Sequence, residues 1–134
     1  MLLRWRDHPG RLTRTDPRYR ADAFARVKAL HLGRLPALRA GRPIWIWGAG
    51  RHGRQLGRAL QREGVALSGY VDIDAAKIGR TRRGCPVHAP GALTNAAPRP
   101  LVLAAVPVHG ARALIRRRLN QLGYAEGRDY ICCA

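Results

Sequence analysis

Beyond its first third, this chain repeats short apolar runs that contain few charged residues. The most extended runs cover residues 44–47, 65–71 and 101–106, and shorter candidates cover 85–87 and 129–134. Continuous apolar strands of this kind are typical of parallel sheets that are covered on both faces. The pattern therefore predicts a sheet whose strands are buried from two sides.

Amphipathic segments separate these runs. Residues 52–63 place Leu56 and Leu60 on one helical face, and Gly64 follows as a stop signal. Residues 111–123 predict a second helix. Its inward side chains would be Leu114, Ile115, Leu119 and Leu122. Alternating strands and helices predict an α/β fold, a Rossmann-like three-layer arrangement around a short parallel sheet. Right-handed crossovers place the second strand beside the first and the third major strand on the other side.

The first part of the chain has a different pattern. Residues 1–20 are polar and contain two prolines, so we expect a loosely held, extended arm. A helix should follow and end near Pro36. Its apolar residues at near-helical spacing are Phe24, Val27, Leu30 and Leu35. We therefore divide the chain into an N-terminal arm and helix at 1–41 and a Rossmann-like domain at 42–134.

A glycine-rich turn follows the first predicted strand, with the spacing G-x-G-x-x-G. In such a turn, Gly48 permits the sharp bend, Gly50 lets the backbone approach a pyrophosphate, and Gly53 lets helix and strand pack closely. The N-terminus of the next helix then faces the anion. The alternative is a turn that keeps this geometry and binds nothing. The candidate cofactor-binding residues are Gly48, Ala49, Gly50, Arg51, His52, Gly53 and Asp72.

Asp72 ends the second predicted strand at the spacing expected of a ribose-binding acid. With Asp74 it also forms D-x-D, a spacing used to hold a metal beneath a nucleotide-sugar diphosphate. Its place at the second strand favours the ribose role for Asp72 and a solvated helix-start role for Asp74, with no metal. Two acids would repel a 2′-phosphate, so NAD is favoured over NADP.

No assembled catalytic site can be read from the sequence. His52 lies in the glycine turn, and His109 follows the third major strand at the edge where ligands bind. A loop histidine is more often a surface residue than a catalyst. We find no Tyr-x-x-x-Lys pair and no nucleophile elbow, and we expect no catalytic residues in this chain.

Composition narrows the function classes. The 134 residues suit one domain, and no apolar stretch is long enough for a membrane span or a signal peptide. Cys85, Cys132 and Cys133 lack zinc-site spacing and are interpreted as reduced thiols of a cytoplasmic protein. The net charge of +17 reflects arginine throughout the chain. It indicates either a generic basic surface or a phosphate-bearing partner, with nucleic acid disfavoured.

Three segments carry a resemblance to a known family. GRPIWIWGAGRHGRQLGRAL, VDIDAAKIGRTRRGCPV and the final 34 residues resemble the C-terminal region of bacterial family 2 glycosyltransferases. The leader WRDHPGRLTRTDPRY resembles the segment where their catalytic domain ends. More distantly, 44–106 is similar to the nucleotide-sugar-binding domain of bacterial sugar acyltransferases. The resemblance implies an accessory domain without sugar-transfer activity of its own.

Three hypotheses follow. The first is an accessory module that binds a nucleotide or nucleotide-sugar and accompanies a glycosyltransferase. The second is a fragment of an NAD-dependent oxidoreductase. The third is a basic module that binds nucleic acid or a membrane surface. The possible cofactors are therefore NAD or a nucleotide-sugar.

Overall fold

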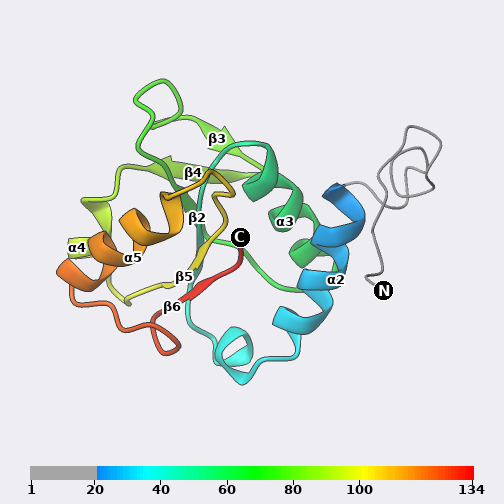
Figure 1. The fold of residues 1–134 in the computed structure, drawn as a ribbon. Coiled ribbons are helices and arrows are strands. Elements are labelled where there is room, and N and C mark those ends of the chain that lie inside the picture. The colour runs from blue at the N-terminus through cyan, green and yellow to red at the C-terminus, as the bar shows by residue number, and fades with distance from the viewer. Residues whose placement is uncertain (1–20) are drawn as a thin grey trace, which may run out of the picture.

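The computed structural model describes residues 21–134, which form a sheet with helices on both faces (Figure 1). Within these residues one sheet has six strands in the order β3-β4-β2-β1-β5-β6. The strands are β1 (Ile44–Trp47), β2 (Gly69–Val71), β3 (Thr81–Arg82), β4 (Cys85–His88), β5 (Leu101–Ala104) and β6 (Tyr130–Cys132). The helices are α2 (Ala21–Gly33), α3 (Arg51–Arg62), α4 (Ala92–Asn95) and α5 (Ala111–Gln121), with a 3-10 helix η2 at Pro36–Arg39. The predicted arm at 1–20 lies outside the described residues.

The strand order confirms the predicted crossovers. β1 pairs in parallel with β2 on one side and with β5 on the other, and β6 extends the sheet beyond β5. β4 runs parallel to β2, while the short β3 is antiparallel to β4. The fold is therefore the predicted three-layer α/β arrangement around a mainly parallel sheet.

Alternate residues of each strand divide the core into two clusters. Ile46 of β1 packs in the cluster beneath α2 and α3, whereas Trp47 packs in the cluster beneath α4 and α5. The neighbours Cys132 and Cys133 likewise pack against opposite clusters, because adjacent residues of a strand point to opposite faces of the sheet. All three cysteines are free thiols, and burial raises the pKa of Cys133 to about 12.

Helix α2 ends at Gly33, just before Pro36, and packs against α3 (Figure 1). Its buried face consists of Ala25, Ala29 and Leu32, which join the core cluster beneath α3. Small residues allow the two helices to approach closely. The larger apolar side chains that recur at near-helical spacing in the sequence are largely exposed. They are Phe24, Val27, Leu30 and Leu35.

Two further expectations need correction. The predicted strand at 65–71 is shorter, because only Gly69–Val71 pair with neighbouring strands. Val65 is still buried, so the apolar residue at this position reflects burial in the core and not pairing in a strand. In α5, Ile115 and Leu119 point inward as predicted, but Leu114 is 65% exposed. Leu114 instead lies beside the pocket described below.

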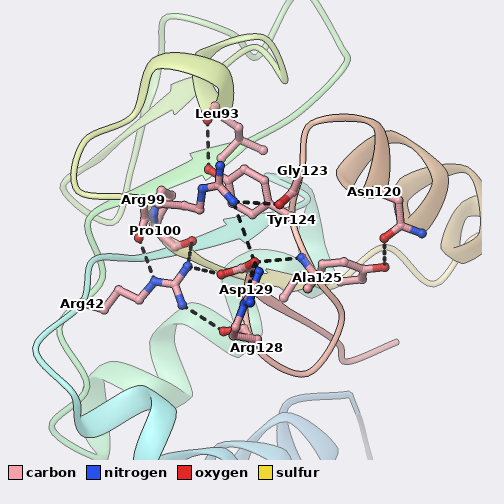
Figure 2. A network of polar contacts seen from close by, with 11 residues as sticks. Arg42, Leu93, Arg99, Pro100, Asn120, Gly123, Tyr124, Ala125, Arg128 and Asp129 are labelled. Carbon is pink, nitrogen blue, oxygen red and sulfur yellow. Dashed lines mark hydrogen bonds and ion pairs between the residues drawn. The ribbon is translucent and has the colours of Figure 1, made fainter.

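A network of ion pairs and hydrogen bonds around Asp129 connects the loops at the amino-terminal edge of the sheet (Figure 2). Asp129 is buried and accepts hydrogen bonds from the Ala125 N–H at 2.8 Å and from Arg42 Nη2 at 2.8 Å. Arg99 and Arg128 lie 3.8 and 3.3 Å from the same carboxylate. Arg42 also donates to the carbonyl groups of three residues in the flanking loops, namely Arg99, Pro100 and Arg128. Asp129 thus joins the segments that enter β1, β5 and β6.

Candidate nucleotide-binding site

The glycine turn lies between β1 and α3, as predicted, and two of its glycines are required by the fold. Gly48 has φ +123°, a region that side chains other than glycine rarely adopt. A Cβ on Gly53 would lie 1.7 Å from the carbonyl oxygen of Gly48. Gly48 therefore permits the bend, and Gly53 permits α3 to pack closely against the end of β1.

Gly50 differs from both. Its φ is −81° and its ψ is −163°, an extended conformation that any residue adopts. A Cβ at this position would meet only Lys77 Nζ, at 3.5 Å. Nothing in the described fold therefore requires glycine at position 50, whereas close approach of a ligand to the backbone would require it.

The N-terminus of α3 presents unpaired donors. Within residues 21–134 no side chain caps this helix, and the N–H groups of Gly50, Arg51, His52 and Gly53 find no acceptor. The first turn carries no acid and includes Arg51 and Arg54, although the helix dipole disfavours positive charge there. Free N–H groups together with cationic side chains form a favourable place for an anion.

Asp72 has a role that the sequence did not reveal. Its carboxylate is largely buried; Oδ2 accepts from the Ala49 N–H and Oδ1 from the Asp74 N–H, both at 2.9 Å. Lys77 Nζ lies 3.9 Å from Oδ2. This corrects the expectation for Ala49, whose N–H is held by Asp72 and is not offered to a ligand. That Asp72 binds a ribose stays a prediction. A ribose hydroxyl would have to donate to a carboxylate lone pair that these two N–H groups leave free.

Asp74 starts a turn, whereas the sequence predicted that it would start a helix. Its Oδ1 accepts from the Ala76 N–H at 2.9 Å, and its carbonyl accepts from the N–H groups of Lys77 and Ile78. These contacts position Lys77 beside the glycine turn. In the described part of the chain, no three His, Cys, Asp or Glu side chains gather as a metal site would require.

A pocket of about 820 Å³ opens where β1, β2 and β5 end. This edge contains the point between β1 and β5 where the crossovers change direction, the usual ligand position in open parallel sheets. Its lining includes Trp47, the glycine turn and Asp72. The volume lies within the range of small-molecule sites. The other walls come from the loops after β2, β4 and β5 and from α5.

The rim of the pocket combines cations with exposed apolar side chains. Ile73, Val108 and Leu114 are 77%, 67% and 65% exposed, and all three line the pocket. Arg51, His52, Lys77 and Arg118 also line it, and Asp72 is the single acidic residue of the lining. This composition fits a ligand that joins an anionic group to a flat apolar one.

Sequence reasoning identified the turn but missed Lys77, Arg118 and the apolar rim. Only folding brings these residues to the turn, since no local spacing marks them. His52 lines the pocket and is exposed, whereas His109 is exposed and lies outside the lining.

The contacts of Asp72 predict a structural effect of its removal. We expect Asp72→Ala to lower the free energy of unfolding by roughly 1.5–3 kcal/mol, because two N–H groups lose a charged acceptor. Asp72→Asn, which keeps one acceptor oxygen, should lose about half as much. Urea unfolding of both variants measures the effect. Unchanged stability of Asp72→Ala would show that the carboxylate does not hold the turn.

Comparison with known proteins supports the fold. No family model matches the chain, and no curated protein matches it. The structure of UDP-D-quinovosamine 4-dehydrogenase from Vibrio fischeri is similar with a TM-score of 0.55 and 26% identity, over 60% of this chain and 71% of that chain. The Rex-family repressor RSP matches with a TM-score of 0.55 and 19% identity, over 77% of this chain and 56% of its own.

RSP in complex with NAD+ and operator DNA is also similar, with a TM-score of 0.55 and 18% identity, over 78% of this chain and 55% of that one. The present chain thus spans about half the length of the repressor chains. These likenesses confirm the Rossmann-like fold. In the described residues, no helix is long and apolar enough to cross a membrane.

Proposed function

We propose that this chain is a nucleotide-binding module whose ligand places a diphosphate against the N-terminus of α3. The observation that carries the proposal is Gly50. A purely architectural turn needs Gly48 and Gly53, and both are explained by backbone geometry. The described fold does not require glycine at position 50, whereas a ligand that approaches the backbone there would require it.

The rest of the pocket supports the same ligand. The unpaired N–H groups of residues 50–53 and the cations Arg51 and Lys77 suit the two phosphates. A base could lie against exposed Ile73 and the apolar residues after β5. The V. fischeri dehydrogenase is named for a UDP-sugar, and RSP was crystallised with NADH. NAD and UDP-sugars share the diphosphate, which is the part that the turn would hold.

The association with a glycosyltransferase is part of this proposal. It is supported by the family 2 resemblance of the three sequence segments named above. The described pocket holds no paired carboxylates or other catalytic set, so the module would bind and not transfer sugar alone. A sugar-transfer domain encoded directly upstream would support the association. Robust sugar transfer by this purified chain would contradict it.

Calorimetric titration with NAD, UDP and a UDP-sugar tests the binding proposal. We expect at least one ligand to bind wild type with a Kd well below about 1 mM, which corresponds to −4.1 kcal/mol. Gly50→Val should abolish this binding without unfolding the protein, because position 50 is extended and open.

Gly91→Val is the matched control. Gly91 has φ −60° and open space around its Cβ position, and it does not line the pocket. It should bind like wild type. The proposal fails if no nucleotide binds wild type at millimolar concentration, or if Gly50→Val and Gly91→Val bind equally well.

A further inference from the structure

A second hollow lies between α3 and the β3–β4 hairpin and shares no residue with the glycine-turn pocket. Its volume is about 290 Å³. We call it the arginine hollow, because four of its six lining residues are arginines. The lining consists of Arg54, Gln55, Arg58, Thr81, Arg82 and Arg83.

The charge in the arginine hollow is uncompensated. No acidic residue lines it, and none of its four arginines forms an ion pair within residues 21–134. Arg54 and Arg58 are four residues apart on α3, a spacing at which like charges repel. The hairpin then adds Arg82 and Arg83 to the same side. An arrangement with so little internal compensation favours a bound anion.

Two local features indicate that the arginines are held in place. Arg83 has φ +51° in the tight turn before Gly84, a left-handed position that arginine rarely adopts. Its Nε donates to Gln61 Oε1 of α3 at 2.9 Å, which ties the hairpin to the helix. Arg82 Nε is buried and has no acceptor among the described residues. The hollow therefore contains an unsatisfied donor and an arginine fixed at a conformational cost.

We propose that the arginine hollow binds a small anion with at least two phosphate groups, of the pyrophosphate class. Guanidinium groups pair with phosphate oxygens through parallel N–H donors, and arginines from two sides can contact two phosphates. The small volume of the hollow favours a compact anion over a nucleic acid, because a nucleic-acid backbone needs an extended track of cations.

Pyrophosphate titration of the Gly50→Val variant tests this proposal, because that background removes the diphosphate site proposed at the turn. In calorimetry at constant ionic strength we expect one pyrophosphate per chain. Adding Arg58→Gln and Arg82→Gln should weaken binding about a hundredfold, since each lost hydrogen bond to a charged group is worth about a decade.

The matched control adds Arg34→Gln and Arg117→Gln, which remove the same charge from exposed positions outside the hollow. This pair should change binding less than twofold, roughly the scale of general charge effects at a distance. Thermal unfolding confirms that each variant is folded.

Three results would overturn the proposal. If both pairs of substitutions weaken pyrophosphate binding equally, the overall positive charge of the protein binds the anion and not the arginine hollow. Loss of pyrophosphate binding on Gly50→Val alone would assign it to the glycine turn. A short DNA duplex that binds more tightly than pyrophosphate and loses more affinity with Arg58→Gln and Arg82→Gln would make the hollow part of a nucleic-acid surface.

Discussion

Gly53→Ala should lower the free energy of unfolding by about 3 kcal/mol or more, at the upper end of overpacking effects. The added Cβ would lie 1.7 Å from the carbonyl oxygen and 2.7 Å from the carbonyl carbon of Gly48. Both atoms belong to the backbone, so relief requires α3 to move away from β1. Alanine would otherwise favour the helix by roughly 1 kcal/mol over glycine, so a loss must come from the contact.

Gly50→Ala is the control within the same turn. Its Cβ would meet only a flexible lysine end, so stability should stay within about 0.5 kcal/mol of wild type, as for ordinary surface changes. Chemical denaturation of both variants measures the contrast. Equal stability of Gly53→Ala and Gly50→Ala would show that residue 53 does not lie as close to the carbonyl group of Gly48 as the structure places it.

Asp129→Ala should cost about 3–5 kcal/mol, the usual loss when one partner of a buried ion pair is removed. The substitution leaves Arg42 without its carboxylate and the Ala125 N–H without an acceptor (Figure 2). Glu126→Ala is the matched control. The Glu126–Arg116 pair is exposed, so its loss should have a far smaller effect.

The same carboxylate predicts a pH dependence. Burial raises the pKa of Asp129, but hydrogen bonds from Ala125 and Arg42 and the charge of Arg128 lower it more, so the pKa stays below its ordinary value. Its contribution is complete above the unfolded pKa of about 3.9 and is lost as the pH falls through the lower folded value. Stability measured across this range should fall less steeply for Asp129→Ala. If the free energy of unfolding falls with pH at the same slope in wild type and in Asp129→Ala, the ion pairs of Asp129 do not stabilise the fold.

The sequence predicted the parts of this fold that depend on local pattern. The strands β1 and β5 are short apolar runs that are buried from both faces, and α3 carries Leu56 and Leu60 four residues apart. Crossover handedness then placed β2 and β5 on opposite sides of β1. Each of these predictions depends only on periodicity and chain direction.

The buried face of α2 could not be predicted in the same way. Large apolar side chains suggested one face, but the helix packs through Ala25 and Ala29. Close helix packing selects small residues, and hydrophobicity alone does not reveal that selection. Leu114 also lies outside the core, in the lining of the pocket at the carboxyl edge of the sheet.

The candidate site was predictable as a turn but not as a surface. Spacing identified Gly48, Gly50 and Gly53, yet only the structure separates the two that the fold requires from the one that it does not. The position of Asp72 after β2 was also correct, but its two backbone contacts depend on the bend of the chain. Tertiary contacts of this kind leave no spacing in the sequence.

Amide chemical shifts of the 15N-labelled protein, followed during titration with NAD and with a UDP-sugar, show directly whether a nucleotide binds at the N-terminus of α3. We expect one of these ligands to shift the amides of Gly50, Arg51, His52 and Gly53 most strongly, together with that of Ile73. The amide of Gly91, which lies outside the pocket, should stay in place. Binding that leaves residues 50–53 unshifted, or no shift at millimolar ligand, would contradict a nucleotide site at this turn.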